Sequence, residues 1–227
     1  MRIRIRHETF GAIFDLIYVA LMTNMLLVLG CLPLVVGLLA TDPARSWPLL
    51  ALVAPVCAPG LCAAFAVLAA YTGNRSTAVV TTFVRAWRAS ARRAITLGAV
   101  ATAALVVLGV DARAAWGHPI GAVAIPVLLV AMTLIVATSL LALVVLAERP
   151  AVRLRDAGRV CVYLAVRRWY LTVASLIVLA LLEALLVSSP AIALGLATAP
   201  LLYVVWANSR FTLNAALGSA PGLAARA

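Results

Sequence analysis

The stretch that decides the fold is residues 58–93, APGLCAAFAVLAAYTGNRSTAVVTTFVRAWRASARR. Its first part is apolar enough to cross a bilayer. Its last part is an amphipathic segment that carries arginines and runs directly into the next apolar segment. The order is a membrane span, a surface helix and a second span, and the same order recurs further along the chain.

The composition indicates a membrane protein. Of its 227 residues 66% are hydrophobic, and the mean hydropathy is +1.14, whereas an ordinary globular domain is roughly 45–50% apolar. The net charge is +11 and all 18 basic residues are arginine. These arginines lie in short loops between apolar runs, which is typical of juxtamembrane segments that face anionic lipid and not of nucleic-acid binding.

We therefore expect an all-α, polytopic transmembrane helical bundle, built as one integral membrane domain over residues 1–210 with a short flexible cytoplasmic tail at 211–227. Pro33 should bend the first span, and Pro55 and Pro59 should interrupt the second. The six predicted spans cover residues 14–39, 47–71, 94–110, 120–146, 170–189 and 190–208.

Two cytoplasmic amphipathic helices are predicted between the spans. The first begins at an N-cap, Ser76, and ends at Arg93. Three- and four-residue spacing places its apolar side chains on one face and its arginines on another. The second lies within residues 148–169. The candidate contacts to the membrane surface or to a partner are Phe83, Arg85, Trp87, Arg88, Arg92 and Arg93 in the first helix and Arg153, Arg155 and Arg159 in the second. Each helix is either a linker lying on the membrane surface or a docking surface for a cytoplasmic partner.

The arginines also predict the orientation of the chain. If the loops alternate between the two sides of the membrane, sixteen arginines fall on one side, and only Arg45 and Arg113 fall on the other. Positively charged short loops stay in the cytoplasm. We therefore expect a multi-pass protein of the bacterial plasma membrane with both termini in the cytoplasm.

The spans contain few groups capable of chemistry. Glu183 lies deep within the fifth span and Asn24 within the first, so these two are the candidate intramembrane polar sites. Glu183 is either a protonated side chain hydrogen-bonded to another span or a contact for a proton or a substrate. The four cysteines form no CxxC pair and are interpreted as packing residues. The sequence has no phosphate-binding loop, GxSxG or HExxH motif. We expect no enzyme activity, cofactor or metal.

One group of residues resembles a known family. Asn24 is followed by Leu32-Pro33, by Pro59 before two alanines, and then by the arginine-rich segment FVRAWR at 83–88, which closes with Arg92 and Arg93. This order resembles the YesL-like family of bacterial membrane proteins, catalogued as domain of unknown function 624. The resemblance covers roughly residues 10–168, although Ala58 replaces the family glycine.

Members of that family are often encoded beside carbohydrate ABC importers and have no established biochemical activity. The resemblance therefore implies an accessory protein of a carbohydrate ABC uptake system, with ABC transporter subunits and anionic lipids of the bilayer as partners. Two alternatives stay open, namely a small transporter that uses Glu183 and a structural membrane protein that binds anionic lipid or a partner.

Cysteine labelling tests the predicted topology. A cysteine placed at position 45 or 113 should react with an impermeant reagent in intact cells, because both positions lie on the arginine-poor side. A cysteine at 88 or 155 should react only after the cells are permeabilised. The parent chain without cysteines is the control, and the reverse labelling pattern would show that the orientation is wrong.

Overall fold

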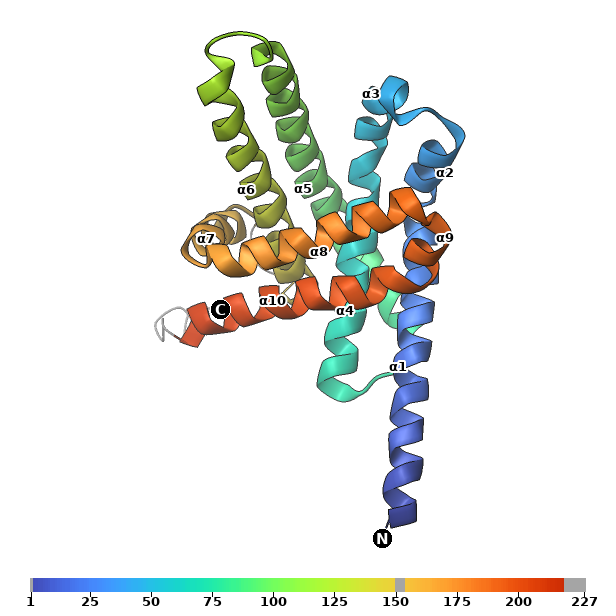
Figure 1. Cartoon of the computed structure of the whole chain (residues 1–227). Helices are drawn as coiled ribbons and strands as arrows, with labels where there is room; N and C mark the ends of the chain where they lie inside the picture. Colours follow the sequence, from blue (N-terminus) through green and yellow to red (C-terminus); the bar gives the residue numbers. More distant parts are fainter. Residues whose placement is uncertain (1, 150–153, 219–227) are drawn as a thin grey trace.

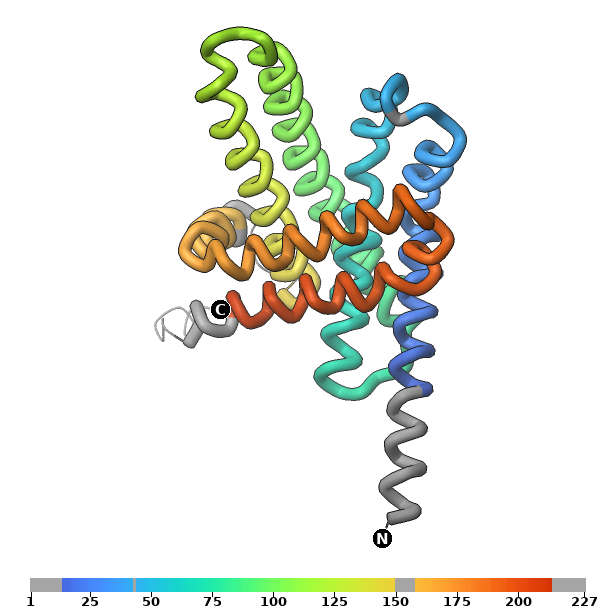
Figure 2. Tube along the Cα trace, viewed as in Figure 1, coloured from blue at the N-terminus to red at the C-terminus, as the bar shows by residue number. Residues whose placement is uncertain are grey.

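The chain folds into α-helices joined by short turns in the computed structural model (Figure 1). The structure describes the backbone of residues 2–149 and 154–218 and the side chains of residues 14–42, 44–149 and 158–213. Figure 2 traces the path of the chain through these elements. In chain order they are α1 (Arg2–Gly30), α2 (Leu32–Ala40), α3 (Pro43–Val53), the 3₁₀ turn η1 (Ala54–Cys57), α4 (Ala58–Asn74), α5 (Val79–Ala115), α6 (Gly121–Glu148), α7 (Leu154–Arg167), α8 (Trp169–Ser188), α9 (Pro190–Ile192), the π-helical turn η2 (Ala193–Ala197) and α10 (Thr198–Gly218).

Five segments are long and apolar enough to cross a membrane, and α1 with α2 form a sixth if this bent pair counts as one span. The predicted all-α polytopic bundle is therefore confirmed. The five are Ala44–Asn74, Val79–Ala115, Gly121–Glu148, Trp169–Ser188 and Pro190–Leu213.

The core of the bundle is built around α4. Cys62, Ala63, Ala64 and Phe65 are all 0% exposed, and α4 contacts α1, α5, α6 and α10. Three of these four side chains are small, so the neighbouring helices can approach closely, and such packing stabilises helix association in lipid.

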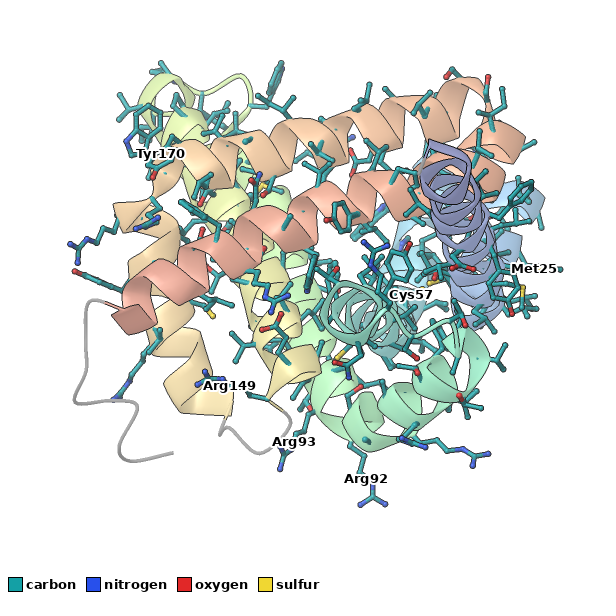
Figure 3. The ribbon with its side chains drawn as sticks, turned by 90° about the horizontal axis from the view of Figure 1, so that it is seen from below. Met25, Cys57, Arg92, Arg93, Arg149 and Tyr170 are labelled. Atoms are coloured by element: carbon teal, nitrogen blue, oxygen red, sulfur yellow. The ribbon has the colours of Figure 1, made fainter. Side chains whose placement is uncertain are left out.

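The helices do not all run in one direction. α1, α4, α5 and α6 form an upright group, and α8 and α10 lie side by side across it (Figure 1). The view from below shows the same crossing, with α1 and α4 nearly end-on and α8 and α10 extended across the molecule (Figure 3). The turns at 40–44 and 115–120 lie at one end of the upright group, and the turn at 75–78 lies at the other (Figure 1).

The predicted breaks in the first two spans are confirmed. The chain bends by 72° between α1 and α2, and Pro33 occupies the first turn of α2, where its missing N–H costs no hydrogen bond. In the second span Pro55 lies within the 3₁₀ turn that joins α3 to α4. The two breaks lie close together, since Cys31 Sγ is 3.6 Å from where a Cβ on Gly60 would stand.

Several predicted boundaries were wrong. The surface helix and the third span, expected as separate segments, form the single helix α5, which begins at Val79 and not at Ser76. The second basic segment does form a separate helix, α7, and Thr172 of α8 donates a hydrogen bond to the Ala165 carbonyl across the break. α10 remains helical to Gly218, beyond the predicted end of the last span at residue 208.

Close packing of α5 on the second span predicts a cost for side chains at Gly98. A Cβ there would stand 3.0 Å from the Ala58 Cβ and 3.2 Å from the Pro55 Cα. Gly98→Val should therefore lower the free energy of unfolding in detergent by about 1–3 kcal/mol, the usual cost of overpacking. Gly109→Val is the matched control on the same helix, because nothing lies within 4 Å of where a Cβ on Gly109 would stand. Equal stability of the two variants would contradict this packing.

Candidate functional site

The first half of α5 is fixed to the bundle by one face. Val79 is 2% exposed and Phe83 is 5% exposed, and Ser90 and Ala94 continue this buried face at helical spacing. The end of the Phe83 ring lies 3.8 Å from where a Cβ on Gly30 would stand. Phe83, expected on the membrane-facing side, is thus packed in the protein core.

The opposite side of this half-helix presents charge. Arg85, Arg88 and Arg92 are exposed and follow one another at intervals of three and four residues. Figure 3 shows Arg92 pointing away from the helices. Within the described part of the chain none of these three arginines makes an ion pair or a side-chain hydrogen bond. We call the three side chains the α5 arginine face.

An exposed apolar strip lies beside the α5 arginine face. Val80 is 43% exposed, and Val84 and Trp87 are each 38% exposed. Val80 and Val84 of the strip and Arg85 and Arg88 line an open depression together with Thr81 and Ala89. Adjacent cationic and apolar strips are the surface expected of a helix that meets a membrane interface or a partner.

The arginines near the end of α7 and on α10 are engaged within the fold. Arg167 Nη1 donates a hydrogen bond of 2.9 Å to the Tyr163 hydroxyl. The Arg168 guanidinium lies 5.5 Å from the centre of the Phe211 ring. Arg210 lies 5.1 Å from the Trp206 ring centre and 3.8 Å from the Glu148 carboxylate.

The second predicted group of surface arginines is only partly described. Arg159 lies on α7 and is exposed. Arg155 belongs to the same helix, but its side chain lies outside the described residues, as does the whole of Arg153. Arg93, at the end of the first group, is exposed and points outward in Figure 3.

Asn24 joins two distant segments of the chain. Its side chain is 2% exposed, and Nδ2 donates a hydrogen bond of 2.9 Å to the Gly195 carbonyl in the π-helical turn η2. A π-helical turn leaves backbone carbonyls without their usual helical donors, and Asn24 supplies one. Its Oδ1 is buried without a hydrogen-bond partner in the described structure.

Glu183 is not part of this contact. It is exposed on α8, and among the described side chains it makes no hydrogen bond or ion pair. The expected hydrogen bond from Glu183 to another span is therefore absent from the described residues. The two intramembrane polar residues that the sequence indicates have different environments, one buried and one exposed.

The structure shows a small cavity, lined by both polar and apolar side chains, that the sequence did not predict. It lies between α6, α8 and α10 and has a volume of about 20 Å³, which is room for about one water molecule. Asn208 Nδ2 lies 3.5 Å from Ser175 Oγ across it. The spacing of Asn208, Ser209 and Thr212 in an apolar segment was the available signal. The polar side chains that line the cavity are Thr172, Ser175, Asn208, Ser209 and Thr212.

Of the four free cysteines, Cys31 and Cys57 lie next to one another, and Cys62 and Cys161 are buried elsewhere in the fold. Burial raises the pKa of the Cys161 thiol on α7 to about 11, so this thiol is protonated and unreactive at neutral pH. Among the described residues no three His, Cys, Asp or Glu side chains lie close enough to hold a metal ion.

Comparison with known proteins found no match to a family model, to a curated protein or to a solved structure.

The Asn24 contact predicts a measurable loss of stability. Asn24→Leu should lower the free energy of unfolding in detergent by about 0.6–1.7 kcal/mol, the range for a hydrogen bond between spans, because the Gly195 carbonyl loses its donor. Met25→Leu is the control, since Met25 is the next residue and is 63% exposed. An Asn24→Leu protein as stable as this control would show that the hydrogen bond contributes nothing.

Proposed function

We propose that this chain is an accessory protein of a carbohydrate ABC uptake system in the bacterial plasma membrane, and that it contacts the transporter or anionic lipid through the α5 arginine face. Both termini lie in the cytoplasm in this proposal, together with the first half of α5. The protein acts by binding and positioning a partner and catalyses no reaction of its own.

The observation that carries the proposal is the free α5 arginine face on a rigid support. Arg85, Arg88 and Arg92 have no ion pair in the described structure, while Val79 and Phe83 fix the same helix to the core. A preorganised cationic surface binds an acidic protein surface or phosphate groups at a low cost in side-chain and backbone order.

The arrangement of the turns also supports the orientation. Arg45 and Arg113 belong to α3 and α5 near the turns at 40–44 and 115–120, and these two turns lie at one end of the upright helices. The turn at 75–78, which leads into the α5 arginine face, lies at the other end (Figure 1). This separation follows the distribution of charge that the positive-inside rule requires.

Affinity purification from the native host in mild detergent tests the proposal. The intact chain should retain ABC transporter subunits. Replacing Arg85, Arg88 and Arg92 together by Gln should reduce their recovery by about tenfold or more, since each arginine near an anionic surface contributes about 1 kcal/mol. The matched control replaces Arg45 and Arg113 by Gln, which should leave the recovery unchanged.

Other outcomes identify the other functions. Recovery of the chain without protein partners, but with anionic lipid that the triple variant loses, would indicate a lipid-organising protein. A lone chain that carries a sugar across the membrane of a purified vesicle would indicate a transporter. Equal recovery of ABC subunits by the triple variant and the control would remove the α5 arginine face from the contact.

A further inference from the structure

α8 is the least covered of the long apolar helices. It has 20 residues with a mean hydropathy of 2.4 in its most apolar window, and none of that window is buried within the chain. α4, by comparison, buries nine residues. The large side chains Val173, Ile177, Leu181 and Val187 are between 42% and 88% exposed. Much of the circumference of α8 is therefore available to lipid or to another protein.

A carboxyl group lies at the border of this exposed surface. Glu183 is exposed, as are Ala180, Ala184 and Val187 around it. A carboxyl that faces hydrocarbon is costly, about 2.5–3.5 kcal/mol on insertion scales, and intramembrane charges are almost always paired or turned toward a protein interior. Within the described residues nothing in this chain pairs with Glu183.

The side chains next to Glu183 suit close contact with a helix. Ala180 and Ala184 are separated by one helical turn and are both exposed. Two small residues at this spacing let the backbone of a second helix approach closely in a membrane. We call the surface formed by Ala180, Glu183, Ala184 and Val187 the α8 face.

We propose that the α8 face docks a transmembrane helix of another membrane protein, and that this helix carries a lysine or arginine that pairs with Glu183. Charge complementarity selects this occupant, because the face is apolar except for one carboxyl. The alanines supply the close approach, and the cation supplies the partner that the carboxyl lacks.

A second copy of the chain fits the α8 face less well. A two-fold symmetric contact centred on the α8 face would place Glu183 against Glu183. The arginine closest to Glu183 along α8 is Arg168 at its N-cap, and fifteen residues at 1.5 Å per residue separate the two by about 22 Å. A copy of α8 therefore offers no cation beside the carboxyl in such a contact.

Site-specific photocrosslinking in native membranes tests this proposal. A photoreactive amino acid at Ala184 of the full chain should form an adduct with a membrane protein, and the cross-linked peptide should be a transmembrane segment that contains Lys or Arg. The same photoreactive residue at Val100, which is 67% exposed on α5, is the control for non-specific contact.

Variants at Glu183 decide whether the charge matters. Glu183→Leu and Glu183→Gln should each reduce the adduct yield by about threefold or more, and Glu183→Asp should retain it. If Glu183→Leu is poorly expressed, Glu183→Lys combined with Glu at the partner's cationic position should restore the yield. An adduct with a second copy, a partner segment without a cation, labelling of lipid alone, or an unchanged yield with Glu183→Gln would each overturn the proposal.

The two tests are separable. If the partner of the α8 face is a membrane protein unrelated to sugar uptake, the docking proposal holds and the uptake proposal fails. If ABC subunits are recovered through the α5 arginine face and Ala184 yields no protein adduct, the uptake proposal holds and the docking proposal fails.

Discussion

The close packing of α4 is the constraint on which the rest of the bundle depends. Between helices in lipid there is little hydrophobic driving force, so association depends on close van der Waals contact and on a few hydrogen bonds. Cys62, Ala63 and Ala64 keep α4 narrow at its centre, and all three are 0% exposed. Glycines extend the same arrangement to the neighbouring helices, since a Cβ on Gly60 or Gly98 would meet atoms of α1, η1 or α4. Bulk added at these contacts would separate the helices that position every other element.

The irregular points of the fold follow from a second constraint, that backbone groups in lipid require hydrogen-bond partners within the protein. At the π-helical turn η2 the Gly195 carbonyl accepts a hydrogen bond from Asn24, and the Ala193 carbonyl accepts from both the backbone N–H and the hydroxyl of Thr198. The break between α7 and α8 is bridged by Thr172, which bonds to the Ala165 carbonyl. Asn24, Thr172 and Thr198 therefore serve the backbone at or beside breaks in the helices, whereas others such as Thr23 and Ser209 bond to the carbonyl one turn earlier in their own helix.

Local signals in the sequence predicted the helices. The arrangement of the helices relative to one another depends on long-range packing, which the sequence does not show. Hydropathy and proline identified the spans and the bends at Pro33 and Pro55, because these depend on a few consecutive residues. Helical spacing placed Arg85, Arg88 and Arg92 together correctly, but it grouped Phe83 with the outward strip, since periodicity cannot distinguish a face in lipid from a face on another helix. The crossing of α8 and α10 over the upright group and the cavity at Ser175 and Asn208 depend on contacts between distant segments, which one sequence does not reveal.

Some charged side chains make contacts within the fold, and others make none in the described structure. Arg167, Arg168 and Arg210 contact aromatic rings. The contact of Arg168 with Phe211 joins the start of α8 to α10, and that of Arg210 with Glu148 joins α10 to α6. The α5 arginine face and Glu183 have no such contacts in the described structure. A charged side chain next to hydrocarbon carries a desolvation cost that the fold must offset with a compensating contact. For these groups the described chain provides none, and in our two proposals the compensating groups are phosphates or an acidic surface for the arginines and a cation for the carboxyl. The unused charges, more than any cavity, are therefore the observations on which both proposals rest.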